Sequence, residues 1–265
     1  MARHATQPQR DHAGMKRFYT HATTHAAAAA TTHAAAAATT AAATHTPAPA
    51  GFTVHLDGRP IKTPKRAPLV VPTRALADAM AGEWAAQGEN IVPATMPMTG
   101  MANAAIDIIA PDCAAFAAPL AAYGETDLLC YRAPEDDLAA HEAAHWNPVM
   151  DWAERHYGVE FTLVSGIVHA AQPPRTLAQL AHALHAHNAF ALAALSPIIT
   201  IGGSLICALA LAEGAFGAEQ LWDVVTLDEI WQEQQWSAVD GAEEACAIEQ
   251  DEWHAAAHFL AMLSA

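Results

Sequence analysis

The chain has 265 residues, and 53% of them are apolar, so it is long enough and apolar enough to bury a substantial core. Twelve basic residues against 28 acidic ones give a formal net charge of -16, which repels nucleic-acid phosphates and anionic membrane surfaces. We therefore expect no nucleic-acid partner. The four cysteines are scattered without a C-x-x-C pair, which favours buried thiols over a disulfide framework or a zinc ribbon.

Residues 1–50 differ in composition from the rest of the chain. They hold a single acidic residue, and residues 23–40 read TTHAAAAATTHAAAAATT, a nearly perfect eight-residue repeat. Such a segment has no large side chains to bury in a core. We expect residues 1–50 to be a weakly ordered leader and insertion rich in Ala, Thr and His, with residues 16–19 as the exception.

A β-rich domain with helices is predicted for residues 51–133. Apolar and polar residues alternate from 52 to 56, which indicates a strand, and Asp57-Gly58 favours a hairpin turn after it. Thr73 is suited to cap a helix that Gly88 ends. The other elements expected here are strands at 67–72 and 127–132 and a helix between 100 and 122.

The pattern becomes mostly helical in residues 134–265, which we predict to be a second, α-helical domain. The expected helices span about 137–157, 176–194, 198–213, 218–236 and 242–263, and a strand is expected at 160–168. The predicted fold class is α+β, with an N-terminal β-rich domain followed by a C-terminal helical bundle.

One apolar stretch, residues 189–212, is long enough to be tested as a membrane span because it carries no charge. Pro197, Gly202 and Gly203 interrupt it, and no basic flank or aromatic belt frames it. We expect no membrane span here, but a buried helix or two helices with a bend near Pro197.

The string HEAAH at 141–145 matches the zinc-peptidase pattern H-E-x-x-H. On a helix this spacing places His141 and His145 on one face as metal ligands, with Glu142 as general base. No third ligand comes in a recognisable context, and short patterns arise easily in a chain with 16 histidines. A zinc-dependent hydrolase is therefore the alternative function, and a solvated His/Glu face with no metal is the preferred interpretation.

The string LDEIWQEQQW at 227–236 combines acids with large apolar side chains. On a continuous helix Glu229 falls between Trp222 and Trp236, one on either side at seven positions, so its carboxylate lies on a tryptophan stripe. Two interpretations stay open. Thr226-x-x-Glu229 matches a capping box at the start of a new helix, whereas a helix that runs through from residue 218 favours an acidic docking surface for a partner.

Several segments together resemble the ATP synthase assembly chaperones of mitochondria and α-proteobacteria, the ATP-twelve family. They occur in the order of that family and cover nearly all of residues 51–236. The segments are KRFY at 16–19, GFTVHLDGRPIKTP at 51–64, APLVVPT at 67–73, EWAAQGENIVPATMPMT at 83–99, DLLCYRAP at 127–134, WNPVMDWAERHYG at 146–158, GSLICALALAEG at 203–214 and LDEIWQEQQW at 227–236.

This resemblance implies a chaperone that holds the unassembled α subunit of the F-one catalytic head until the β subunit replaces it. It implies no catalysis, no cofactor and no metal, and we expect a monomer in a bacterial cytoplasm, with the mitochondrial matrix as the alternative compartment. The region of the acidic helix is implied to matter for this function. The predicted partner-binding residues are Asp228, Glu229, Trp231, Gln232 and Trp236.

Overall fold

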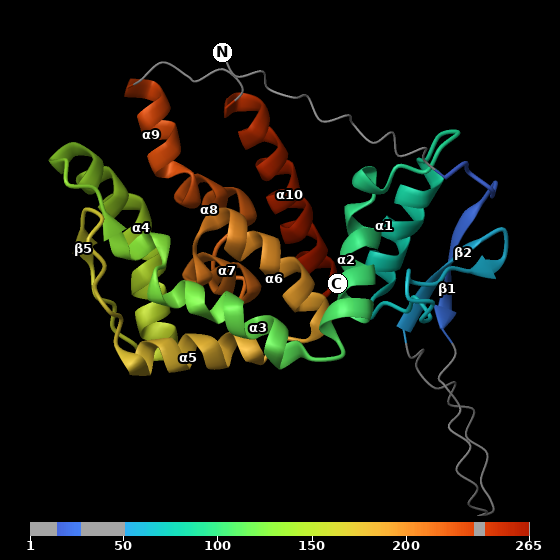
Figure 1. Cartoon of the computed structure of the whole chain (residues 1–265), viewed down its shortest axis with the longest axis horizontal. Helices are drawn as coiled ribbons and strands as arrows, with labels where there is room; N and C mark the ends of the chain where they lie inside the picture. Colours follow the sequence, from blue (N-terminus) through green and yellow to red (C-terminus); the bar gives the residue numbers. More distant parts are fainter. Residues whose placement is uncertain (1–14, 28–50, 236–241, 265) are drawn as a thin grey trace, which may run out of the picture.

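The computed structural model describes residues 15–27, 51–235 and 242–264. A small antiparallel sheet lies at one end of the molecule, α1 (Arg74–Ala85) and α2 (Pro97–Ala104) lie next to it, and the remaining helices form a larger body at the other end (Figure 1). N-terminal strands are thus followed by helices, which confirms the predicted α+β fold class.

The sheet contains three strands in chain order: β1 (Ala22–Ala27), β2 (Gly51–Leu56) and β3 (Arg59–Pro60). The predicted hairpin turn between β2 and β3 is confirmed. Asp57 and Gly58 have φ angles of 46° and 78°, and two consecutive positive φ angles are typical of the tight turn that matches the twist of a hairpin.

Strand β1 corrects one expectation about the N-terminal segment. Residues 1–50 were expected to be weakly ordered apart from 16–19, but Ala22–Ala27 pair with β2 along their whole length, from Ala22 opposite Leu56 to Ala27 opposite Gly51. Backbone pairing explains this strand, since it depends less on side-chain size than core burial does. The repeat that follows lies outside the described residues.

Helix α1 packs against the sheet through an apolar stripe. As predicted, Thr73 caps it, with its Oγ1 accepting a hydrogen bond from the Leu76 N–H at 3.3 Å. Leu76 and Met80 are buried in a cluster with Val54 of β2. The strand predicted at 67–72 is wrong, because this segment pairs only through isolated bridges. Its prolines, at both ends of the apolar run, have no N–H to donate to a ladder.

The helical body is built from η2 (Ala105–Ile109), a single π-helical turn, and seven α-helices. These are α3 (Cys113–Ala121), α4 (Asp136–Tyr157), α5 (Pro174–His185), α6 (Ala189–Gly202), α7 (Leu205–Ala212), α8 (Ala218–Val225) and α9 (Leu227–Gln235). The last helix, α10 (Ala242–Met262), packs along α6 and reaches α1 and α2.

Two long predicted helices are broken. The helix expected at 176–194 ends at His185, the last residue of α5, and α6 begins after Asn188. The Oδ1 of Asn188 caps α6 by accepting from the N–H groups of Phe190 and Ala191 at 3.0 Å each. The helix expected at 218–236 is divided into α8 and α9 at Thr226. Asn is among the strongest helix N-caps, so the first break carried a readable signal.

Two predicted strands are much shorter than expected. Residues 127–132 form the 3-10 turn η4 (Leu128–Cys130) and then β4 (Tyr131–Arg132). The only strand within 160–168 is β5 (Val164–Ser165), and it pairs with β4 in parallel. Apolar runs of this length do not distinguish a strand from a buried turn.

The apolar stretch at 189–212 forms two buried helices, as one interpretation held, but the break is not at Pro197. It lies at Gly203, whose φ of 61° is left-handed, and Pro197 is inside α6. Within the described residues no single helix is both long and apolar enough to cross a membrane. Residues 97–109 and 113–130 reach that length and composition only as a pair, which is bent by 109°.

The hydrophobic cores interlock across the predicted domain boundary at residue 134. Ala105 and Leu120, from the N-terminal side of that boundary, belong to the large helical core. Phe259 of α10 is buried with the sheet and α1, and the Thr73 hydroxyl donates to the Met262 carbonyl at 2.7 Å. The division at 51–133 and 134–265 stays a prediction, but α10 ties the two parts together.

Candidate functional site

Helices α4, α8 and α9 meet at one end of the helical body and bring together the residues that the sequence singled out (Figure 1). Trp146 of α4 is fully buried, and its indole N–H donates to the Val224 carbonyl at the end of α8 at 2.9 Å. Because an indole has a single polar atom, this bond satisfies Trp146 and fixes α4 against α8.

The junction between α8 and α9 has one residue, Thr226. Its N–H and its hydroxyl both donate to the Trp222 carbonyl, at 3.0 and 2.8 Å, and its own carbonyl accepts from the Ile230 N–H at 3.0 Å. These are helix-type bonds that cross the junction. A capping box would instead direct the Thr226 N–H to the Glu229 carboxylate, so the bond to Trp222 argues against the capping box even though the helix is divided at Thr226.

Two carboxyl groups meet between α4 and α9. Glu142 is fully buried, and both its oxygens accept from the Ala133 N–H, at 2.9 and 3.1 Å. Its side chain also shares a hydrogen bond with Asp228 of α9. Two carboxyl oxygens can bond only through a proton, so this contact requires one of the two acids to be protonated.

The proton of this pair belongs on Glu142. Burial raises the pKa of Glu142, the Ala133 N–H lowers it, and both the charge and the hydrogen bond of Asp228 raise it further. Burial also raises the pKa of Asp228, whereas the bond from Glu142 lowers it. Glu142 is therefore the donor and Asp228 the acceptor. We call Glu142 and Asp228 the carboxyl pair.

Arg132 supplies the positive charge beside the carboxyl pair. Its guanidinium lies over the Trp146 ring, 5.0 Å from the centroid, and donates to the Asn147 Oδ1 at 2.8 Å. Burial lowers the pKa of Arg132, and the nearby Glu142, Cys130 and Asp228 raise it. With Glu142 protonated, Asp228 and Arg132 balance one another, so the buried cluster carries no net charge.

The two histidines of HEAAH lie on the outer side of α4. His141 and His145 are exposed, their ring centroids are 4.5 Å apart, and the His141 ring packs on Trp231 of α9 at 5.4 Å. Together with Ile230 they line a hollow of about 270 Å³. This hollow and the exposed face of α9 form one surface, defined by His141, His145, Glu229, Ile230, Trp231 and Gln232, which we call the α9 surface.

The structure does not support a zinc-hydrolase arrangement. Glu142, the residue that would act as general base, faces Ala133 and Asp228 in the interior instead of the two histidines. The described residues contain no group of three or more His, Cys, Asp or Glu placed to hold a metal ion. The expectation of a solvated His/Glu face is correct for both histidines and wrong for Glu142, because the carboxyl pair draws it inward.

The predicted partner-binding residues occupy different environments. Glu229 and Gln232 are exposed, Trp231 is half-buried, and Asp228 is half-buried with its carboxyl in the pair. Trp236 lies outside the described residues. The tryptophan stripe does not surround Glu229 as expected, because Trp222 is buried in the core against Trp253, at 5.6 Å between centroids.

Sequence reasoning missed the link between Glu142 and Asp228, which lie 86 positions apart. One signal was available, because Glu142 follows the apolar stripe of α4 through Leu138, Trp146 and Val149 at helical spacing. A carboxylate on that stripe is buried, and a buried carboxylate needs partners. The identity of the partner could not be found without the tertiary structure.

One family model and two crystal structures are similar to this chain. The family model of the ATP12 chaperone protein matches residues 16–154. The crystal structure of Atu1473, a candidate chaperone from Agrobacterium tumefaciens, is 38% identical, with a TM-score of 0.81 over 94% of this chain and 86% of that chain. The crystal structure of Atp12 from Paracoccus denitrificans is 32% identical, with a TM-score of 0.81 over 94% of this chain and 98% of that one.

These matches place the chain in the class of molecular chaperones. It belongs to the ATP12 family, which confirms the resemblance seen in the sequence. Its function is accordingly that of an ATP synthase assembly chaperone.

Proposed function

We propose that the chain binds the unassembled α subunit of the F-type ATP synthase through the α9 surface. On this proposal it acts by shielding an interface and not by catalysis, and it needs no cofactor. The monomeric state and the bacterial cytoplasm stay predictions.

The exposed chemistry of the α9 surface is the observation that carries this proposal. Ile230 is 43% exposed although it is a large apolar residue, and it lies beside the half-buried Trp231. Glu229 is exposed next to them, and the acidic Asp223 lines the same hollow. Apolar anchors with charges at their rim are what protein-binding surfaces present.

The charge of the whole C-terminal part supports a basic partner surface. After Arg175 the chain has no further Lys or Arg, while it has 12 acidic residues. The resulting negative electrostatic potential accelerates the encounter with a positively charged partner and disfavours binding of an acidic one. The surface of the α subunit that would complement the α9 surface is therefore apolar with a basic rim.

Glu229→Lys is expected to reduce recovery of the α subunit at least tenfold, because it places a cation where the partner is proposed to be basic. The measurement is copurification of the host's α subunit, expressed alone with the tagged chaperone. Ile230→Ser is expected to act in the same direction by removing an apolar anchor.

The matched control is Asp78→Lys, which makes the same charge change at an exposed position of α1, outside the helical body. It should leave recovery unchanged, and all three variants should keep the melting temperature of the unmodified chain within a few degrees. Normal recovery with Glu229→Lys and Ile230→Ser would refute the α9 surface as the binding site.

A further inference from the structure

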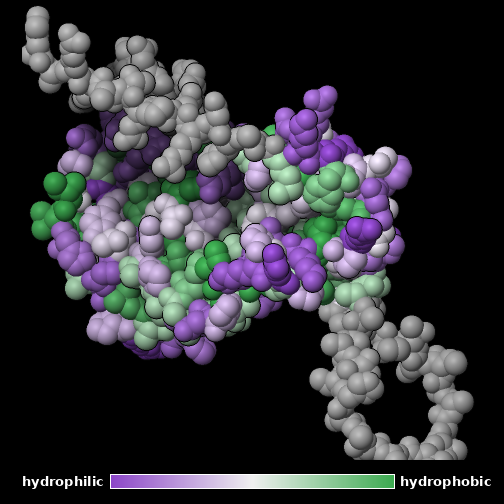
Figure 2. Space-filling model, turned by 45° about the vertical axis from the view of Figure 1, so that its right-hand side comes forward, coloured by the Kyte–Doolittle hydropathy of each residue, from purple (hydrophilic) through white to green (hydrophobic). Residues whose placement is uncertain are grey.

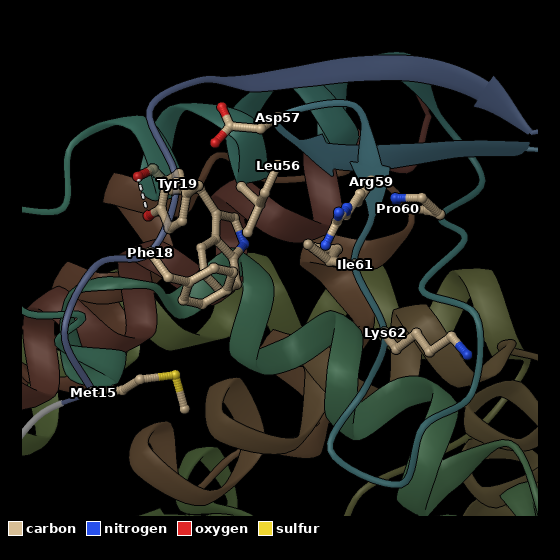
Figure 3. Close-up of a pocket in the computed structure, with 10 residues that line it drawn as sticks. Met15, Phe18, Tyr19, Leu56, Asp57, Arg59, Pro60, Ile61 and Lys62 are labelled. Atoms are coloured by element: carbon tan, nitrogen blue, oxygen red, sulfur yellow. Dashed lines mark hydrogen bonds between the residues drawn. The ribbon is translucent and has the colours of Figure 1, made fainter.

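The molecule has a second exposed apolar surface, at the opposite end from α9. Residues 15–17 run beside residues 89–91, and the N–H groups of Thr20 and His21 bond to Asp57 in the β2–β3 turn. Met15, Phe18 and Tyr19 line, with the β2–β3 hairpin and Trp84 of α1, a hollow of about 530 Å³. Figure 3 shows Met15 and Phe18 on one side of this hollow and Arg59, Ile61 and Lys62 on the other. We call it the N-terminal hollow. Its volume is within the range that binding pockets have.

Tyr19 and Trp84 are bonded to one another in the wall of the N-terminal hollow, whereas its apolar lip is exposed. The Tyr19 hydroxyl donates to the Trp84 carbonyl at 2.7 Å, and the two rings meet edge to face at 5.6 Å. In contrast, Met15 and Phe18 are 66% and 67% exposed. Figure 2, which turns this end of the molecule forward, shows hydrophobic residues next to strongly hydrophilic ones here. Exposed apolar side chains on a fixed support favour contact with another protein.

The charges at the rim differ in how they are engaged. The Asp57 carboxylate accepts from the N–H groups of Thr20 and His21 at 3.0 and 2.8 Å, and these bonds lower its pKa. Arg59 and Lys62 are exposed and make no side-chain hydrogen bond or ion pair with any residue of the described part of the chain. The rim therefore offers two unengaged cations.

One polar atom of Trp84, a residue that lines the hollow, also lacks a partner. The indole Nε1 of Trp84 is buried and has no hydrogen-bond acceptor among the described residues. A buried N–H without an acceptor costs free energy, which a ligand carbonyl or carboxylate would recover.

The charge distribution along the chain indicates the nature of the occupant. The described residues 15–27 and 51–90, which form this end of the molecule, contain seven basic and four acidic residues, so the end that holds the hollow is basic while the rest of the described chain is strongly acidic. Charge complementarity therefore requires an acidic partner here, opposite to the partner that the α9 surface requires.

We propose that the N-terminal hollow is a second docking site, and that it binds an acidic segment of a partner protein in which an apolar side chain is flanked by Asp or Glu. The apolar side chain lies against Met15, Phe18 and Ile61. The flanking carboxylates pair with Arg59 and Lys62, and an oxygen of the segment accepts from Trp84.

The probe is a fluorescein-labelled synthetic peptide, Asp-Glu-Leu-Phe-Glu-Asp, titrated with the full chain and followed by anisotropy. The double variant Arg59→Glu and Lys62→Glu is expected to weaken binding at least tenfold, because attraction becomes repulsion. The control, Arg155→Glu with Arg175→Glu, makes the same charge change on exposed residues of the helical body and should bind as the unmodified chain does. The basic peptide Lys-Lys-Leu-Phe-Lys-Lys should bind at least tenfold more weakly.

A second measurement tests the location directly. The 15N-labelled chain shows indole N–H signals from its seven tryptophans, and the signal missing in Trp84→Phe is that of Trp84. This signal should shift when the acidic peptide is added. Equal binding of both peptides, or unchanged binding by the double variant, would overturn the proposal. A dimer in light scattering that the double variant dissociates would make a second copy of the chain the occupant and would also overturn it.

This test is independent of the α9 surface. Glu229→Lys should leave the acidic peptide bound with unchanged affinity even though it lowers recovery of the α subunit. Failure of the N-terminal hollow and failure of the proposed function would therefore appear in different assays.

Discussion

Replacing Asp127 with Ala is expected to destabilise the fold by about 3 to 5 kcal/mol, because it leaves several buried donors without an acceptor at once. Asp127 precedes η4 in the chain and is fully buried against the N-terminus of α7. Its carboxylate accepts there from the Ser204 hydroxyl at 2.8 Å and the Ile206 N–H at 3.0 Å. It also accepts from the Leu129 N–H at 3.2 Å. The measurement is the free energy of unfolding in urea.

The control for this prediction is Asp127→Asn, which has the same shape and keeps one acceptor oxygen. It should cost less than half as much as the alanine variant. Burial raises the pKa of Asp127 to about 6. The folded chain therefore binds a proton at Asp127 more tightly than the unfolded chain does, and the stability that this proton binding contributes falls as the pH rises from about 4 to 6. That dependence should be absent in Asp127→Asn. Equal losses below about 1 kcal/mol in both variants would contradict the anchoring role.

Local signals in the sequence predicted the features that depend on a few neighbouring residues. The Asp57-Gly58 turn is of this kind, since positive φ angles restrict which residues fit. The cap at Thr73 is another, since its partner is three residues away. Both follow from chemistry that is complete within one turn of chain, and both are confirmed.

Features that depend on distant contacts were not predictable in the same way. Strand β1 forms because β2 pairs with it across the intervening repeat, and its Ala and Thr side chains carry no strong strand signal. The inward position of Glu142 depends on its contacts with Ala133 and Asp228. The local pattern HEAAH contains no information about these contacts, and it suggested an exposed Glu142 instead. Whether α9 carries the binding site stays a prediction, but the structure separates two of its residues: Asp228 is part of the carboxyl pair, whereas Glu229 is exposed.

Stability is expected to fall by about 2 kcal/mol through the carboxyl pair as the pH rises from 5.5 to 8. The pKa of Glu142 is raised in the folded state, mainly by burial. A carboxyl group with a raised pKa binds its proton more tightly in the folded chain than in the unfolded chain, so raising the pH through the folded pKa costs stability. Above it, Glu142 and Asp228 both carry charge, and Arg132 balances only one of them.

Glu142→Gln isolates this effect because its amide can donate to Asp228 at any pH, while its oxygen still accepts from the Ala133 N–H. The variant should match the unmodified chain at pH 5.5 and exceed its free energy of unfolding at pH 8 by about 1 to 2 kcal/mol. For a chain of this size, that difference corresponds to a melting temperature higher by roughly 2 to 6 °C.

Asp151→Asn is the matched control, since it removes one carboxyl charge from the exposed side of the same helix, α4. The free energy of unfolding of Asp151→Asn should depend on pH as that of the unmodified chain does, because the overall acidic charge affects the two proteins alike. If Glu142→Gln showed the same loss between pH 5.5 and 8 as the unmodified chain, the proton would not be on Glu142, and α9 would be held against α4 by some contact other than the carboxyl pair.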